Sequence, residues 1–266
     1  MLKKITIGLA ATALTLTVAS GAVLAQTPEE KGLEIAKEGD KRGEGWVDSF
    51  VNLKMVLVDK AGNESVRDMR VKSLEGEGGE GDKSLMIFDT PKDQEGVAML
   101  TYTHKTEPDD QWLYLPALKR VKKISSRNKS GPFVGSEFAF EDISSQEVEK
   151  YKYKFLRDET LDGMDCFVTE RLPEDKYSGY TRQVAWVDKK EYRILKVEYY
   201  DRKNSLLKTL RNTGWNLYLE KFWQPDLSVM QNHQTGKATR LVYENYQFKV
   251  GLDDKDFTKN SLKRAK

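Results

Sequence analysis

Turn signals recur along almost the whole chain, and they constrain its fold more than any other feature. Short clusters of Gly, Pro, Asn and Asp stand about every 10–15 residues, at 60–63, 76–81, 90–93, 107–110, 162–163, 188–191, 201–204, 224–226 and 234–237. The stretches between them have the length of strands and are rich in Val, Tyr, Phe, Leu and Thr. They leave no room for the helical crossovers that parallel strands need. The sequence therefore predicts about ten or eleven antiparallel strands, largely in an up-and-down meander.

A sheet of that size does not stay flat, because the twist of successive strands accumulates and curls it. It must close, fold onto itself, or leave a concave apolar face that helices and loops cover. One short helix is expected to start after Thr27, where Pro28 and Glu30 form the pattern of a capping box, and to end near Lys41. From Trp46 onward the hydrophobic period changes to two, which predicts a strand with one buried face.

The first 25 residues have the pattern of a secretory signal peptide. Lys3 and Lys4 precede a modestly apolar run, and Val23 and Ala25 stand before the expected cut. A permanent membrane anchor is the alternative, because the run is barely long enough to cross a bilayer. No cysteine lies near the cut for lipid attachment. We therefore expect residues 26–266 to form one soluble, exported domain without a lipid anchor.

Charge and cysteine content exclude several classes of protein. The chain has 44 Lys and Arg against 42 Asp and Glu, a near balance that argues against a nucleic-acid binder. Cys166 is the only cysteine, so no intramolecular disulfide can form, and its strand-like surroundings predict a small buried hydrophobe. The two histidines, His104 and His233, lack the spacing of metal ligands, and the sequence predicts neither a metal nor a cofactor.

Catalytic motifs are weak, so the sequence does not predict an enzyme. Residues 76–81 match the spacing of a dinucleotide-binding loop, but no helical pattern follows and Glu77 and Glu80 would repel a phosphate. Ser126 and Ser205 each begin a Ser-x-x-Lys match without a convincing helix or the further motifs of that enzyme class. There is no Gly-x-Ser-x-Gly nucleophile elbow.

The chain carries more large apolar side chains than one sheet face and two short helices need. It has 5 Trp, 12 Tyr, 10 Phe and 7 Met, most of which must be ordinary core. The surplus, together with a curled sheet, leads to the hypothesis of an internal apolar cavity. A sixteen-carbon acyl chain in such a cavity would gain on the order of 12 kcal/mol before entropy costs. A carrier could work on that gain alone.

One stretch, between Leu115 and Tyr151, has neither the helical nor the strand period. It mixes Phe133, Phe138 and Phe140 with glycines and charges. A long aromatic connection inside a compact domain is usually a lid or a binding loop. A loop whose aromatic side chains plug the core is an equally weighted alternative.

The same region resembles a known family. The run QWLYLPALKRVKKISS at 111–126, continued by SGPFVGSEFAFED at 130–142, closely resembles the outer-membrane lipoprotein-sorting proteins, which are LolA-like periplasmic proteins. Val134, Glu137 and Ala139 depart mildly from the pattern of that family. The resemblance implies a mainly β fold, an incomplete β-barrel made of a strongly curved antiparallel sheet. A few short helices would cover its concave face, which would hold lipid chains.

Candidate site residues lie in and beside this region. Three are expected at the edge of the cavity: Trp112, Tyr114 and Leu115. Three are expected as its roof or gate: Phe133, Phe138 and Phe140. A basic stripe next to the gate would contact an anionic headgroup or an acidic partner, or would only protect a solvated edge strand: Lys119, Arg120, Lys122 and Lys123.

Three functions follow, and the first is our prediction. It is a periplasmic carrier that shuttles a lipid or lipidated cargo between the inner and outer membranes. The resemblance implies an inner-membrane exporter of the resistance-nodulation-division superfamily as its partner, with an outer-membrane acceptor as a further one. The second is an interaction or sensor module for an inner-membrane machine, with a filled core. The third is a hydrolase acting on envelope lipids, for which no local signature exists.

Overall fold

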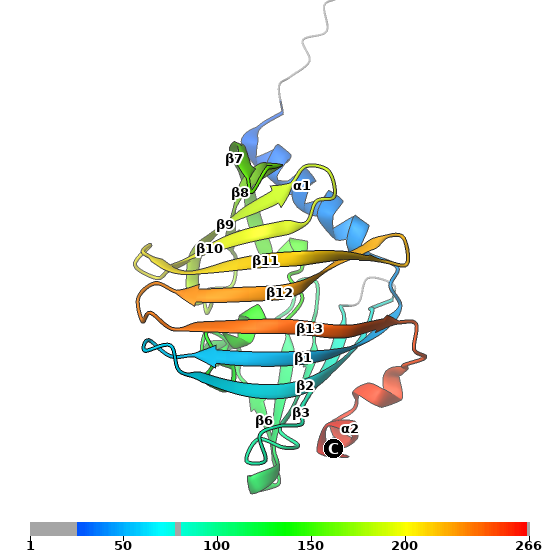
Figure 1. Cartoon of the computed structure of the whole chain (residues 1–266). Helices are drawn as coiled ribbons and strands as arrows, with labels where there is room; N and C mark the ends of the chain where they lie inside the picture. The colour runs from blue at the N-terminus through cyan, green and yellow to red at the C-terminus, as the bar shows by residue number, and fades with distance from the viewer. Residues whose placement is uncertain (1–25, 78–80, 265–266) are drawn as a thin grey trace, which may run out of the picture.

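A single antiparallel sheet of thirteen strands forms most of the protein (Figure 1). The computed structural model describes residues 26–77 and 81–264, so the predicted signal peptide, residues 1–25, lies outside the described residues. The strands follow the order β6-β5-β4-β3-β2-β1-β13-β12-β11-β10-β9-β8-β7. The first and last strands of the chain therefore pair in the middle of the sheet, and β6 and β7 form its two edges.

The strands are β1 Asp48–Val58, β2 Glu64–Leu74, β3 Lys83–Phe88, β4 Ala98–Tyr102, β5 Asp110–Leu115, β6 Arg120–Ile124, β7 Tyr151–Leu161, β8 Met164–Pro173, β9 Tyr180–Asp188, β10 Ile194–Asp201, β11 Leu206–Tyr218, β12 Phe222–Asn232 and β13 Ala238–Phe248. The α-helices of the described residues are α1 Pro28–Gly43 and α2 Lys259–Arg264. Short 3-10 helices lie in the connections: η1 Pro116–Leu118, η2 Ser126–Asn128, η3 Phe133–Gly135, η4 Phe140–Asp142, η5 Val148–Lys150 and η6 Asp254–Phe257. Neither described α-helix combines the length and apolar character needed to cross a membrane.

The predicted fold class is confirmed, because the protein is mainly β with one curved antiparallel sheet that stays open. No pairing joins β6 to β7 within the described residues, so the barrel is incomplete. There are more strands than predicted because β3 to β6 are only five or six residues long. The connection after β5, residues 116–119, also carries no Gly, Asn or Asp that would reveal a turn.

One predicted turn, at 224–226, is wrong. Pro225 lies inside β12, paired with Trp215 of β11. The chain reverses at residues 219–220 instead, where both residues adopt positive φ angles of 48° and 56°. A strand tolerates proline where its ladder is distorted, and Gly214, next to the position opposite Pro225, has a φ of 68°.

Alternating side chains build apolar cores on both faces of the sheet. The largest core lies on the concave face and includes Leu53, Met55, Met69, Phe88, Phe133, Phe138, Met230 and Leu241. A second core lies under η6 and α2 on the other face, and it includes Leu85, Leu100, Trp112, Phe257 and Leu262. A third includes Val168, Trp186 and Cys166, which is buried as predicted, and burial raises the pKa of its thiol.

Helix α1 covers part of the concave face and is fixed at its start by the predicted capping box. The Thr27 hydroxyl accepts a hydrogen bond from the backbone N–H of Glu30 at 3.2 Å, and the Glu30 carboxylate accepts one from the N–H of Thr27 at 2.8 Å. The helix extends to Gly43, two residues past the predicted end. It packs tightly on edge strand β7 at Gly32. A Cβ atom at this position would stand only 2.7 Å from backbone atoms of Lys154, so only glycine allows this close approach.

We predict that Gly32→Ala destabilises the fold by about 1–3 kcal/mol, because the added methyl group forces α1 away from the backbone of β7. Urea unfolding measures the loss. Gly43→Ala is the matched control, since nothing lies within 4 Å of the position of its Cβ and alanine favours a helix. Equal stability of the two variants would contradict the tight contact.

Candidate functional site

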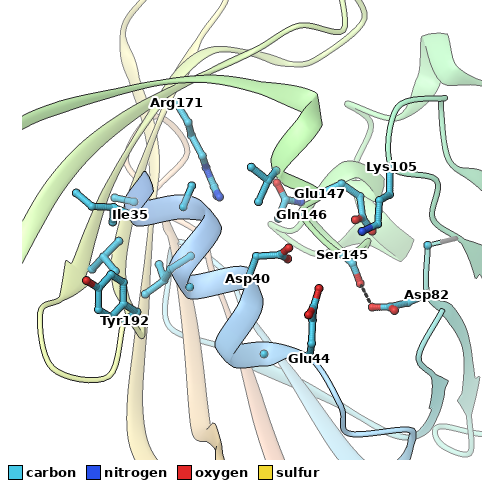
Figure 2. A pocket seen from close by; sticks show the side chains of 18 of the residues that line it. Ile35, Asp40, Glu44, Asp82, Lys105, Ser145, Gln146, Glu147, Arg171 and Tyr192 are labelled. Atoms are coloured by element: carbon cyan, nitrogen blue, oxygen red, sulfur yellow. Dashed lines mark hydrogen bonds between the residues drawn. The ribbon is translucent and has the colours of Figure 1, made fainter. Parts of the chain in front are cut away.

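Two adjoining hollows lie between α1 and the concave face of the sheet. The first, which we call the aromatic hollow, has a volume of about 630 Å³. The second, which we call the polar hollow, has a volume of about 590 Å³ and is shown in Figure 2. Both volumes fall within the range of small-molecule sites. Residues that line both hollows include Gly39, Gly43, Trp46, Tyr192 and Ile194, so the two share a wall.

The aromatic hollow takes most of its wall from the middle of the sheet. Its aromatic lining is Trp46, Phe138, Tyr192, Trp215, Phe222, Trp223, Tyr243, Tyr246 and Phe248. The rings of Tyr246 and Phe248 stack with centroids 5.9 Å apart at 8°. A bulge brings Tyr243 and Tyr246 to the same wall, since Asn245 between them has a φ of 56°. Burial raises the pKa of both hydroxyls, so they stay neutral.

One polar atom in this wall is left without a partner. The indole N–H of Trp215 is buried and has no hydrogen-bond acceptor among the described residues. A buried donor without an acceptor costs roughly 1–3 kcal/mol. An oxygen atom of a bound molecule would satisfy it.

Several carboxylates line the polar hollow. Its lining contains the carboxylates of Asp40, Glu44, Asp82 and Glu147, with Lys105 among them (Figure 2). The Ser145 hydroxyl donates a hydrogen bond to Asp82 at 3.0 Å. Burial is the main cause that raises the pKa values of Asp82 and Glu147. A neighbouring carboxylate adds to the rise in each case, Glu75 for Asp82 and Asp82 for Glu147.

The long connection from β6 to β7, residues 125–150, closes the concave face on the side that α1 leaves open. Phe133 is fully buried and packs edge-on against Phe140, with ring centroids 5.6 Å apart. It also contacts Phe88 of β3 at 6.0 Å. Phe138 is buried too, and of these connection aromatics it is the one that lines the aromatic hollow. The connection therefore plugs the core with its aromatic side chains, and it also forms a wall of the aromatic hollow.

A buried ion pair holds the β6–β7 connection in place. Lys208 of β11 lies 2.6 Å from Asp142 of the connection, and each side chain is only 4% exposed. The same ammonium group donates to the carbonyl of Glu137 at 2.9 Å, and the hydroxyl of Tyr180 donates to Asp142 at 2.9 Å. Asn232 donates to the carboxylate of Glu137 at 2.7 Å. The connection is thus tied by polar bonds to strands β9, β11 and β12.

The predicted cavity-edge residues divide between the two faces of the sheet. Leu115 packs against the concave core, whereas Trp112 and Tyr114 belong to the second core under α2. Successive side chains of a strand point to opposite faces, so Trp112 and Tyr114 cannot share the side of Leu115. Trp112 instead packs edge-on against Tyr102 at 5.2 Å and lies below the ammonium group of Lys259 at 4.6 Å. The structure therefore corrects the expected position of Trp112 and Tyr114.

The predicted basic stripe lies at and beside edge strand β6, away from both hollows. Its four side chains are exposed: Lys119, Arg120, Lys122 and Lys123. Lys123 pairs with Asp110 at 2.5 Å. No histidine lines either hollow. The Nε2 atom of His104 lies 3.4 Å from a carboxylate oxygen of Asp110, and that of His233 lies 2.7 Å from the hydroxyl of Thr209. Among the described residues, no group of His, Cys, Asp and Glu is placed to hold a metal ion.

We predict that Lys208→Met lowers the free energy of unfolding by about 3 kcal/mol, because it leaves the carboxylate of Asp142 buried without its cation. Hydrogen exchange should quicken first in the β6–β7 connection. Lys190→Met is the control, because Lys190 is 90% exposed in its pair with Glu191. Unchanged exchange in the connection of the Lys208 variant would show that the pair does not hold it.

We predict that Glu147→Gln stabilises the protein at pH 7.5. The folded state raises the pKa of Glu147 above its ordinary value of 4.5, so its charged form destabilises the fold at neutral pH. Glutamine removes that charge, and the gain should shrink as pH falls through the raised pKa and disappear below about 4.5. Urea midpoints at pH 7.5 and pH 4 measure it, with exposed Glu95→Gln as the control. A lower midpoint for Glu147→Gln at pH 7.5 would refute the sign.

Comparison with known proteins gives both a family and a fold. A family model described as an uncharacterized protein matches residues 80–264. The crystal structure of an outer membrane lipoprotein-sorting protein domain from Vibrio parahaemolyticus is 56% identical in sequence, with a TM-score of 0.87, over 89% of this chain and 100% of that one. A DUF1329 family protein from Desulfovibrio piger is 30% identical, with a TM-score of 0.83, over 89% of this chain and 99% of that one.

A more distant similarity concerns the fold alone. A LolA superfamily protein from Nitrosomonas europaea is 23% identical, with a TM-score of 0.69, over 86% of this chain and 98% of that one. This similarity shows that the two proteins share a fold. No curated protein matches the sequence.

Proposed function

The chain belongs to the LolA-like family of outer-membrane lipoprotein-sorting proteins, and we propose that it is a periplasmic carrier for a lipid or lipidated cargo. The observation that carries the proposal is the aromatic hollow of about 630 Å³ between α1 and the sheet. Its aromatic wall suits an acyl chain, because burying each methylene is worth roughly 0.8 kcal/mol. The proposed work is binding and release, and it needs no catalytic residue.

The hollow is suited to release as well as to binding. Its wall is made by three separate pieces, namely the sheet, α1 and the β6–β7 connection, and only the sheet is continuous. Movement of α1 or of the connection would open the hollow without breaking a strand pair. A carrier needs such a route, because its cargo must leave at the acceptor.

We propose the cargo and the partners by extension from the family. The relative from Vibrio parahaemolyticus is described as a lipoprotein-sorting protein domain, and we extend to this chain the broader class of acyl-bearing cargo. We propose that it moves this cargo between the inner and outer membranes, with an exporter of the resistance-nodulation-division superfamily as its inner-membrane partner. The exposed basic stripe beside β6 would contact an acidic partner surface or an anionic headgroup.

Native mass spectrometry of the protein purified from its own periplasm tests the proposal. We expect a bound species with the mass of an acyl-bearing molecule, close to one per protein. A protein that is empty in repeated preparations would count against a carrier. An empty protein that captures a membrane partner would favour the interaction module instead.

A blocking variant tests whether the aromatic hollow is the binding place. We predict that Ser73→Trp weakens binding of an acyl chain at least tenfold, because Ser73 lines this hollow and the indole would fill it. Val66→Trp is the matched control on the same strand, since Val66 is 43% exposed and does not line the hollow. Fluorescence titration with a C16 alcohol measures both. Equal affinities of the two variants for the C16 alcohol would show that the acyl chain binds outside the aromatic hollow.

A further inference from the structure

Arg171 of β8 is a buried cation without a carboxylate partner. Its side chain is on the concave face and the residue is only 8% exposed. Its Nε donates to the amide oxygen of Gln183 at 2.6 Å, and its guanidinium lies 5.2 Å from the ring centroid of Tyr151. Among the described residues no carboxylate oxygen lies within 4 Å of it, although 21 other ion pairs occur there.

Such an arrangement is unfavourable for the empty protein. A buried charge normally has a partner of opposite sign, because removal from water is costly and neutral hydrogen bonds recover only part of it. The neutral Gln183 and the face of Tyr151 stabilise the guanidinium partially. Its two terminal NH₂ groups make no hydrogen bond to the described protein residues. These groups are the donors that match the two oxygens of an acid.

The cation is placed where a ligand can reach it. Arg171 lines the polar hollow, and in Figure 2 its guanidinium points into the space above α1. Neutral hydrogen-bonding side chains line the same hollow, including Thr169, Gln146 and Tyr153. Burial raises the pKa of the Tyr153 hydroxyl, which therefore remains a neutral donor.

We propose that Arg171 binds the acidic group, a carboxylate or a phosphate, of an acyl-bearing cargo whose hydrocarbon chain extends into the aromatic hollow. This rests on the proposed carrier function and narrows its cargo to anionic amphiphiles. The hydrocarbon chain of the cargo would run from one hollow to the other along the residues that line both, Trp46, Tyr192 and Ile194. Polar recognition and apolar burial then act at opposite ends of one molecule.

The carboxylates of the polar hollow limit the charge that this site accepts. In Figure 2, Glu44 and Asp82 lie away from Arg171, with Asp40 between them and Arg171. They would repel a second acidic group on the cargo. The hollow is therefore suited to a cargo whose negative charge is confined to the end held by Arg171.

Binding of three C16 ligands tests the proposal: palmitate, hexadecyl phosphate and the neutral hexadecanol. They are titrated into lipid-free protein at pH 8, and the fluorescence of the tryptophans in the aromatic hollow is followed. We expect at least one acid to bind about 10- to 100-fold more tightly than hexadecanol, as charge-assisted hydrogen bonds typically give. The tighter acid identifies the oxyanion.

Substitution of Arg171 separates recognition of the acid from packing. Arg171→Gln keeps a donor for Gln183 but removes the charge, so the preference for the acid should vanish while the affinity for hexadecanol stays within about twofold. Arg171→Lys should retain part of the preference. Arg182→Gln is the control, because Arg182 pairs with Glu170, stacks on Tyr200 and lines neither hollow.

The outcomes distinguish the two proposals. If hexadecanol binds wild-type protein as tightly as both acids, or if Arg171→Gln keeps the preference, the assignment of Arg171 is overturned and the carrier stands. If none of the three ligands binds, the carrier proposal itself fails. Retained hexadecanol binding by Arg171→Gln also shows that this variant is folded.

Discussion

The pairing of β1 with β13 is the constraint on which the rest of the structure depends. It runs from Ser49 opposite Phe248 to Val58 opposite Ala238, and it places both ends of the strand sequence in the middle of the sheet. The edges are then β6 and β7, which are consecutive in the chain. The segment that joins them must return across the opening of the curved sheet. This is why residues 125–150 lie inside the fold, with Phe133 and Phe138 in its main core.

The hollows follow from how that opening is covered. One helix and one irregular connection roof a concave face of thirteen strands, and they contact it at separate places: α1 at β7 through Gly32, and the connection at β11 through Asp142. Between these contacts large aromatic side chains line the space without filling it. A wide sheet that is only partly covered thus leaves a space of about 630 Å³, while the strand ladder stays intact.

Much of the fold could be predicted from the sequence, because its signals are local. The capping box at Thr27 and the period of two after Trp46 each act within a few residues, and both appear in the structure. The site could be predicted less well. Trp112 and Tyr114 stand in the most recognisable run of the sequence. Because side chains alternate between the two faces along β5, both point to the face that α2 covers.

Residues that do line the hollows gave weak signals. Tyr243 and Tyr246 are three apart, and only the bulge at Asn245 brings them to one wall. Arg171 looks like any charged residue of a strand, because its lack of a partner is a property of the folded neighbourhood. In the sequence of β13, the local signal of an aromatic wall is the spacing of two residues between Tyr246 and Phe248, which places both side chains on one face.

The central pairing also sets the order in which the molecule can be assembled. Each flanking meander, β1 to β6 and β7 to β13, is built of neighbours in sequence and can form as soon as its own residues are available. Lys54 of β1 and Val242 of β13 lie opposite each other in the sheet, although most of the chain separates them in sequence. Contacts between residues so far apart in sequence form slowly. The two halves of the sheet therefore join late. Until they do, apolar surfaces of both halves are exposed to water and to other protein chains. During synthesis, which proceeds from the N-terminus, the protein is therefore most prone to aggregate just before its last strand is complete.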